Sequence, residues 1–331
     1  MKRLKSLLIT WEALLVILLV ASIGIGAVLS PYFMTGFNFY ALTSNIMEIA
    51  IMALPMTLII IAGEIDLSVA SVLGLSSVVL GLLWERGNPM WLAIGVALLV
   101  GLVAGSLNGL LVTRLALPSL VVTIGALALF RGLAYVVLGD QAVSNFPATF
   151  TNFGFSTIPG TEFPWSGLIF AMLAVIFGVV LHFSRVGRQL YAIGNNKEAA
   201  RFSGINVSRV KLVLFMLSGV IAALAGVIFT ARFSSARPDN AVGFELVVVT
   251  VVLLGGVNIF GGRGSLLGVV LAIFIIAVLQ NVLGLLNISG DIQSLAIGLL
   301  LILSVLGPNL ARRIQVVIAR RRLAVGSSKQ L

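Results

Sequence analysis

The stretch LVLFMLSGVIAALAGVIFTA, residues 212–231, contains no charged side chain. A helix of about 20 residues crosses the hydrocarbon core of a bilayer, because each residue rises 1.5 Å and the core is about 30 Å thick. Seven more charge-free windows lie at 13–30, 67–84, 87–113, 163–184, 246–262, 264–290 and 292–311, and windows 45–63 and 115–139 hold one charge each. The chain is therefore predicted to be an all-α polytopic membrane protein with about ten transmembrane helices.

The composition indicates a single transmembrane domain over residues 1–331 and excludes several other classes. Of the 331 residues, 60% are hydrophobic and 10% are charged, whereas soluble domains average about 45–50% and 25%. The mean hydropathy is +1.16. The chain has no cysteine and only one histidine, His182, so disulfides, thiolate sites and metal sites of several imidazoles are excluded. We therefore expect no metal and no cofactor.

The distribution of the positive charges predicts the orientation in the membrane. The net charge is +10, but the basic residues gather in short segments instead of forming a face for nucleic acid. Three stand at the N-terminus, six in the loop 185–211 and six near the C-terminus, whereas the loop 140–164 has none. Cytoplasmic loops carry the excess of Lys and Arg. Both termini and the loop 185–211 are therefore predicted to be cytoplasmic, with Arg86, Arg232 and Arg237 outside.

Two glycine patterns bear on helix packing. Gly101, Gly105 and Gly109 form a small-x-x-x-small ridge on one helix face, which favours close packing against another helix. Residues 57–74 and 250–268 also resemble each other, since each reads as apolar helix, short polar glycine turn and apolar helix. The topology above puts both turns on the cytoplasmic side, so we expect a repeat of parallel sense.

The predicted cytoplasmic loop 185–211, RVGRQLYAIGNNKEAARFSGINVSRVK, is expected to contain a short helix. Asn195 is a candidate N-cap, Glu198 follows at capping-box spacing, and Gly204 supplies a left-handed stop. Ala199, Ala200 and Phe202 form a small apolar surface between them. A helix this short is not stable alone and must dock on a partner. The alternative is a connector held at lipid headgroups by its six positive charges.

Three motifs carry a resemblance to a known family. The first motif is Gly194-Asn195-Asn196, followed by Ala199-Ala200 and Ser203-Gly204-Ile205. The second is the turn 63–70 (GEIDLSVA). The third consists of 235–238 (SARP) and 243–246 (GFEL), which lead into 254–256 (LGG) and 261–265 (GGRGS). Together they resemble the permease subunits of ribose-type ABC importers, the monosaccharide and autoinducer-2 group. The resemblance spans nearly the whole chain. It implies that the ATPase-coupling residues are Gly194, Asn195, Asn196, Glu198, Ala199, Ala200, Ser203 and Gly204.

The resemblance also implies the partners and the setting. Such a permease pairs with a second copy or a paralogue, with a separate ABC ATPase and with a periplasmic substrate-binding protein, among the lipids of the bacterial inner membrane. No G-x-x-x-x-G-K-[ST] motif occurs in the chain, so a subunit without its own ATPase site, not an enzyme, is expected. The stretch 234–250, SSARPDNAVGFELVVVT, is closer to the rhamnose and autoinducer-2 branch, with ribose or another monosaccharide as the alternative.

Charged residues near or within the predicted spans are candidates for the translocation path. Glu48 and Arg131 lie inside spans, where charge is costly and usually functional, although a structural ion pair is the alternative. Asp66 lies in the turn 63–70, and Glu64 stands where the family has a glycine, so we expect Glu64 to face cytoplasmic water. Outside, the loop 140–164 and residues 232–245 are expected to form the mouth that docks the binding protein.

Two other function classes use similar helices. An ion-coupled secondary transporter requires carboxylates or broken helices inside the membrane, and Glu48 fits that requirement best. An intramembrane serine hydrolase requires His182 as its base, but that residue stands at the end of a predicted span. The ATP-driven permease accounts for more of the sequence than either alternative.

Overall fold

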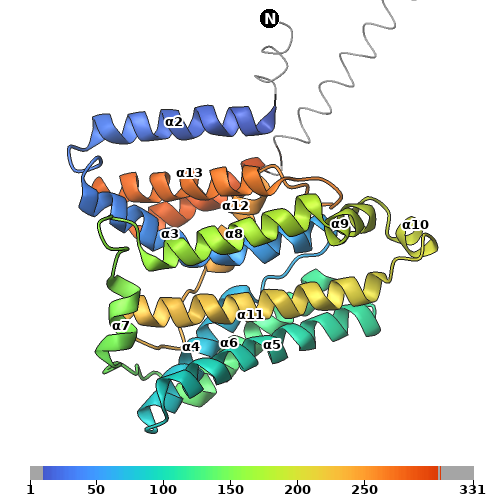
Figure 1. Ribbon diagram of the computed structural model, residues 1–331, viewed down its shortest axis with the longest axis horizontal. Coiled ribbons are helices and arrows are strands. Elements are labelled where there is room, and N and C mark those ends of the chain that lie inside the picture. The colour runs from blue at the N-terminus through green and yellow to red at the C-terminus, as the bar shows by residue number, and fades with distance from the viewer. Residues whose placement is uncertain (1–9, 305, 307–331) are drawn as a thin grey trace, which may run out of the picture.

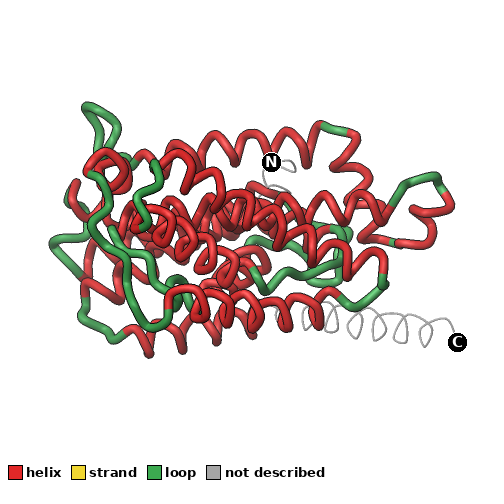
Figure 2. The backbone as a smooth tube through the Cα atoms, turned by 90° about the horizontal axis from the view of Figure 1, so that it is seen from below, coloured by secondary structure: helices red, strands yellow, loops and turns green. Residues whose placement is uncertain are grey.

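The computed structural model describes residues 10–304 and residue 306, and this part of the chain is helical (Figures 1 and 2). The predicted basic clusters at the two termini lie outside the described residues. The helices are α2 (Trp11–Leu29), α3 (Gly36–Ile61), α4 (Val69–Glu85), α5 (Met90–Arg114), α6 (Ser119–Leu138), α7 (Ala148–Phe155), α8 (Trp165–Phe183), α9 (Arg185–Asn195), α10 (Lys197–Phe202), α11 (Val207–Phe233), α12 (Phe244–Leu254) and α13 (Leu266–Leu285).

The prediction of a polytopic helical membrane protein is confirmed. Among the described residues, seven helices are long and apolar enough to cross a membrane, namely α2, α3, α5, α6, α8, α11 and α13. Three shorter apolar helices, α4, α12 and Gly290–Ser304, fall in the remaining predicted windows. Every predicted window thus contains an apolar helix, although these three are shorter than a usual span.

Proline and hydroxyl side chains set where many helices begin. Pro89, Pro118, Pro147 and Pro164 each stand directly before a helix, where the fixed φ of proline suits a helix start and its missing N–H costs nothing. Thr35 precedes α3 and accepts a hydrogen bond from the backbone N–H of Asn38 at 3.3 Å. These signals lie in the turns between apolar runs, which divides the runs into separate helices.

The core surrounds α3, whereas α2 lies at the edge of the bundle (Figure 1). In the most apolar part of α3, 94% of the residues are buried, whereas in that of α2 only 11% are buried. The predicted glycine ridge is confirmed, since α5 packs on α11 through Gly101, Gly105 and Gly109. A Cβ at Gly109 would lie 2.8 Å from a Leu212 methyl, and one at Gly101 or Gly105 would overlap backbone carbonyl oxygens of α11.

The two ends of the bundle are built differently. At one end, α7 packs against the last turn of α11, and the Tyr40 hydroxyl of α3 donates to the Phe155 carbonyl at 2.9 Å. At the other end α9 and α10 project, and the Trp11 indole of α2 donates to the Leu254 carbonyl at 3.0 Å. The start of α2 and the α9–α10 segment therefore share an end, opposite to α7.

Candidate functional site

The loop 185–211 folds as two helices, and its capping differs from the expectation. Asn196, not Asn195, is the N-cap of α10, and its side chain accepts from the Ala199 N–H at 3.0 Å. The carboxylate of Glu198 makes no hydrogen bond to a described residue, so the predicted capping box is wrong. Gly204 does take the left-handed conformation, with φ of 83°, after the helix ends.

Helix α10 is anchored on one side and free on the other. Ala200 packs against Ile193 of α9 and Val207 of α11 in a small apolar cluster. Phe202 is 90% exposed, and Ala199, one turn before it, is exposed as well. The other exposed residues of this tip are Asn196, Lys197, Glu198, Arg201, Ser203 and Gly204. An apolar and cationic tip thus projects beyond the end of the bundle (Figure 1).

The base of this segment is a junction of glycines from three turns. A Cβ at Gly194, in the last turn of α9, would overlap the Ile61 carbonyl oxygen of α3 and the Gly262 amide of the α12–α13 turn. A Cβ at Gly261 would lie 2.9 Å from the Gly63 Cα and 3.1 Å from the Gly194 Cα. The three motifs that carry the family resemblance therefore contribute backbone to this junction, and the two turns of the sequence repeat touch each other there.

Polar contacts hold the glycine junction closed. The Gly262 N–H donates to the Ile61 carbonyl at 2.8 Å. The Asn195 amide donates to the Tyr191 carbonyl at 2.8 Å and to the Gly262 carbonyl at 3.3 Å. The Tyr191 hydroxyl donates to the Gly264 carbonyl at 2.8 Å, and burial raises the pKa of this phenol, which keeps it protonated as a donor. Asn195 therefore ties α9 to the α12–α13 turn.

Asp66 lies in a buried polar network behind the junction. Its carboxylate accepts from the Ser68 hydroxyl at 2.6 Å, from the Ser68 N–H at 3.0 Å and from the Ser218 hydroxyl of α11 at 2.8 Å. The Asn108 amide of α5 donates to the Ser68 hydroxyl at 2.8 Å. The side chain of Asp66 thus joins the start of α4 to α5 and α11.

Glu64 does not face water, which corrects the expectation for this residue. Its carboxylate pairs with the ammonium group of Lys211 in the first turns of α11, and the two side chains are 14% and 7% exposed. Lys211 is one of the six positive charges of the loop 185–211. Because burial removes water from the Glu64 carboxylate, it requires a partner of opposite charge, and the attraction between the two groups offsets the desolvation of both.

Glu48 forms a buried ion pair with Arg232, not with Arg131. The guanidinium of Arg232 donates to both carboxylate oxygens at 2.8 and 3.1 Å and to the Asn45 side-chain oxygen at 2.8 Å. Glu48 is 0% exposed and Arg232 is 9% exposed. Placing Arg232 in an outside loop was wrong, because it belongs to the last turn of α11. The bidentate pair supports the structural alternative for Glu48.

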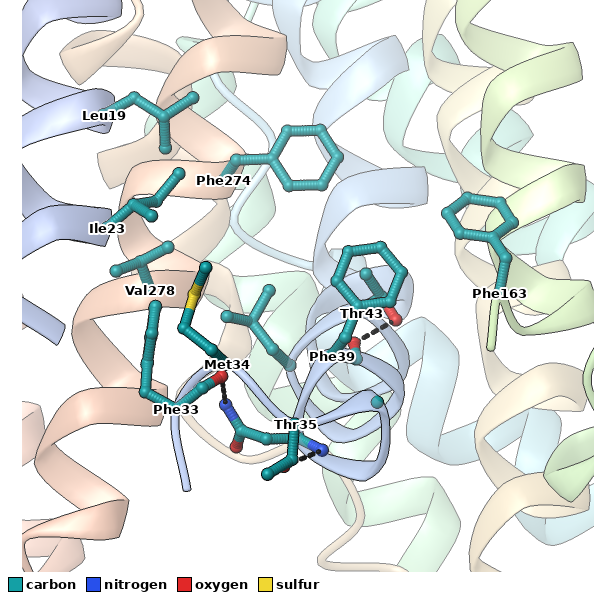
Figure 3. A pocket seen from close by; sticks show the side chains of 13 residues that line it. Leu19, Ile23, Phe33, Met34, Thr35, Phe39, Thr43, Phe163, Phe274 and Val278 are labelled. Atoms are coloured by element: carbon teal, nitrogen blue, oxygen red, sulfur yellow. Dashed lines mark hydrogen bonds between the residues drawn. The ribbon is translucent and has the colours of Figure 1, made fainter. Parts of the chain in front are cut away.

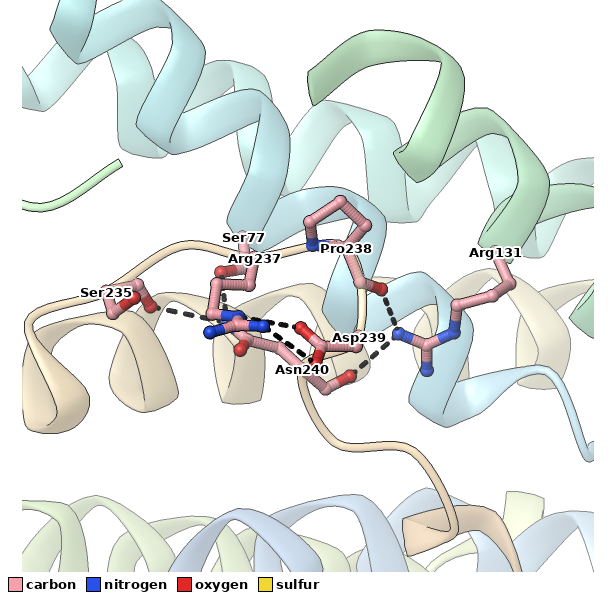
Figure 4. A network of polar contacts seen from close by, with 7 residues as sticks. All are labelled: Ser77, Arg131, Ser235, Arg237, Pro238, Asp239 and Asn240. Carbon is pink, nitrogen blue, oxygen red and sulfur yellow. Dashed lines mark hydrogen bonds and ion pairs between the residues drawn. The ribbon is translucent and has the colours of Figure 1, made fainter. Parts of the chain in front are cut away.

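Arg131 holds the segment between α11 and α12 through backbone carbonyls (Figure 4). Its guanidinium donates to the carbonyls of Pro238, of Asn240 at 2.8 Å and of Ala70 at 3.3 Å. The Asn240 side chain donates in turn to the Ser77 hydroxyl of α4 at 3.1 Å. Within residues 10–304, Arg131 makes no ion pair. Glu48, Asp66 and Arg131 therefore occupy three separate polar networks.

An apolar cavity of about 650 Å³ lies between α2, α3 and α13 (Figure 3). Leu19 and Ile23 point into it from α2, and Phe274 and Val278 from α13. No group of three or more His, Cys, Asp or Glu side chains that could hold a metal ion occurs among the described residues. The polar functional candidates thus lie elsewhere, in the networks described above.

Sequence reasoning missed the partners of these charges. Arg232 and Lys211 stand close to the ends of an apolar run, so they read as loop residues, whereas the structure buries both against carboxylates. The spacing of 184 residues between Glu48 and Arg232 carries no local signal. The one available signal was that Glu48 lies inside a predicted span, where a carboxylate needs a partner.

Comparison with known proteins identifies the family. Residues 38–305 match the family described as branched-chain amino acid transport system / permease component. The chain is 35% identical over 312 residues to the autoinducer 2 import system permease protein LsrD of Klebsiella pneumoniae subsp. pneumoniae, covering 92% of this chain and 93% of that protein. It is 37% identical over 308 residues to LsrD of Yersinia enterocolitica, covering 91% and 92%. No solved structure matches the chain. The chain therefore belongs to the permease family of ABC importers of the ribose and autoinducer-2 type.

Proposed function

We propose that this chain is the membrane-spanning subunit of an ATP-driven importer, through which a sugar-like small molecule passes from a periplasmic binding protein to the cytoplasm. A separate ABC ATPase hydrolyses the ATP, and a second copy or a paralogue completes the pair in the bacterial inner membrane. Seven long apolar helices and three shorter ones among the described residues support the ten-span topology. The six positive charges of the loop 185–211 favour cytoplasmic termini. Relatives named autoinducer 2 import permeases favour autoinducer-2 or rhamnose as substrate, with ribose or another monosaccharide as the alternative.

The observation that carries the proposal is the exposed tip of α10 on its glycine junction. Phe202, 90% exposed beside the cationic residues Lys197 and Arg201, suits insertion into an apolar groove of an ATPase subunit. Gly194 at the base of α9 lies against the backbone of the turns after α3 and after α12. A push on the tip therefore reaches two helix pairs of the core through backbone contacts, with no flexible side chain between them.

The opposite end offers a surface for the binding protein. Val143 of the loop 140–164 and Ala236 of the segment 232–245 pair through two backbone hydrogen bonds of 3.0 and 2.9 Å. The two segments expected to form the mouth are thus joined. Arg131 fixes the second segment from inside the bundle. A role of Glu48, Asp66 and Arg131 in the translocation path stays a prediction, and their contacts fit a role in shaping the path.

Reconstitution tests the proposal. The permease, its ATPase and its binding protein, taken from the same gene cluster, are placed in proteoliposomes, and uptake of labelled autoinducer-2, rhamnose and ribose is measured with and without ATP. The proposal expects uptake only when all three components and ATP are present. Uptake driven by an ion gradient with no ATPase would instead support a secondary transporter.

A further inference from the structure

A second cavity, of about 480 Å³, lies between α3, α13 and the helix Gly290–Ser304. This volume falls within the range of small-molecule sites. Its polar lining consists of five carboxamide side chains, Asn38, Asn45, Gln280, Asn281 and Gln293, and none of its described lining residues is charged. The apolar cavity beside it has only one such side chain, Asn38.

Two of these amides, Asn38 and Asn281, bond each other and fix the cavity wall. The Asn38 amide donates to the Asn281 oxygen at 3.0 Å, and the Asn281 amide donates back to the Asn38 oxygen at 2.7 Å. This reciprocal pair clamps α3 to α13. Gln293 donates to the Ile288 carbonyl at 3.0 Å. The wall is therefore set by hydrogen bonds that need no ligand.

The remaining two amides have unused hydrogen-bonding capacity. Gln280 makes no hydrogen bond to any described residue, and the Asn45 nitrogen makes none either, while the Asn45 oxygen accepts from Arg232. Asn45 is exposed although its neighbours Ser44 and Ile46 are buried. A carboxamide left unpaired inside a membrane protein costs free energy unless water or a ligand satisfies it. These two side chains therefore mark the part of the cavity that faces solvent or a ligand.

The chemistry of the lining selects a class of ligand. A carboxamide both donates and accepts hydrogen bonds, as a hydroxyl group does, so the two match without any formal charge. A zwitterionic amino acid requires charged partners to offset desolvation. The charges bonded to this lining, Arg232 and its partner Glu48, already neutralise each other. We propose that this cavity is a station on the transport path and that it takes a neutral, polyhydroxylated small molecule, not an amino acid.

The position of the cavity fits entry from the end that carries α7. Asn45 stands in the first half of α3, whose early residue Tyr40 contacts α7, and Gln280 stands five residues before the end of α13. The inference rests on the proposed function, since a station requires a transported molecule. It goes further because it assigns the transported molecule a binding place between α3, α13 and the helix Gly290–Ser304.

The test uses the natural absence of cysteine. Q280C is introduced alone, and the complex in nanodiscs is treated with a charged, water-soluble methanethiosulfonate. V175C serves as the control, because Val175 is 67% exposed in the middle of the apolar helix α8, where we expect it to face lipid. We expect Q280C to react and V175C to stay unmodified, and we expect D-ribose, L-rhamnose or D-mannitol, but not L-leucine, to slow the reaction. The inference is overturned if Q280C is as unreactive as V175C. It is also overturned if none of the three polyols slows the reaction of Q280C, or if L-leucine slows it as much as they do.

Uptake by the reconstituted importer supplies the second readout. Q280M retains the size of the side chain but removes its hydrogen bonds, so we expect about a fivefold fall in the uptake rate. Q280N retains the amide and is expected to lie between Q280M and the wild type, while I124M, at a half-exposed position of α6 that belongs to none of the sites above, is the control. Unchanged uptake by Q280M contradicts the inference. Failure of the wild type to show ATP-dependent uptake refutes the proposed function instead, and the thiol assay still reports on the cavity.

Discussion

Replacing Gly194 with alanine tests whether the glycine junction transmits motion from α10 to the core. The added Cβ would meet the Ile61 carbonyl oxygen and the Gly262 backbone, with the Gly262 Cα at 3.0 Å. These neighbours are backbone atoms, so no side-chain rotation relieves the overlap. Restoring an ordinary contact to the carbonyl oxygen requires the two segments to separate by about 1.5 Å. The Cβ would also lie against both the donor and the acceptor of the hydrogen bond from the Gly262 N–H to the Ile61 carbonyl, so this bond would be broken.

The free-energy cost follows from these contacts. Overpacking costs about 1–3 kcal/mol, and an unpaired buried backbone group adds about 1–3 kcal/mol. If about 2 kcal/mol of this cost applies to the closed junction and not to a conformation in which the junction is open, the ratio of closed to open molecules falls about thirtyfold. The apolar contacts of α3 and α11 are untouched, so the helix bundle is expected to persist.

The assay separates ATP hydrolysis from transport in proteoliposomes. We expect G194A to hydrolyse ATP at a rate close to that of the wild type and to take up substrate about thirtyfold more slowly. The matched control is G125A, because a Cβ at this glycine of α6 meets no atom within 4 Å. Uptake by G194A within twofold of the wild-type rate, with an intact complex, would refute the idea that the junction carries the stroke.

Three further changes test the tip of α10 and the two arginine networks. A199R places a charge on the exposed face of α10 and should abolish uptake while leaving the chain folded. The control S208R, at the start of α11, should not abolish uptake. Normal uptake by A199R argues against docking of the ATPase at α10. E48Q leaves the buried Arg232 unpaired and should lower the free energy of unfolding by about 3–5 kcal/mol. The double variant E48Q/R232M should recover much of this loss, as measured by thermal unfolding. Equal unfolding midpoints for E48Q and the wild type would contradict the pairing. R131M releases two carbonyls of the segment between α11 and α12 and the Ala70 carbonyl of α4, so stimulation of ATP hydrolysis by the binding protein should fall while the basal rate stays. Unchanged stimulation would remove the segment between α11 and α12 from the docking surface.

The helical membrane fold could be predicted from the sequence because hydropathy acts locally. A window of about 20 apolar residues must become a helix in lipid, where backbone groups have no other partner. The same holds for the packing ridge, since Gly101, Gly105 and Gly109 share a helix face by spacing alone. The left-handed Gly204 was predictable for a similar reason, because helix ends select glycine within one turn.

Only the tertiary structure decided which distant residues meet. Arg232 and Lys211 read as loop charges, yet each lies buried against a carboxylate from a distant segment. Asn195 had the spacing of an N-cap, but its side chain ties α9 to the turn before α13, and Asn196 takes the cap. Charge pairing and backbone contact between segments depend on the three-dimensional path of the chain, and no local spacing encodes that path. The apolar stretch 212–231 therefore determined by itself that the chain enters a membrane, while the fold decided that the lysine before this stretch and the arginine after it are structural ions.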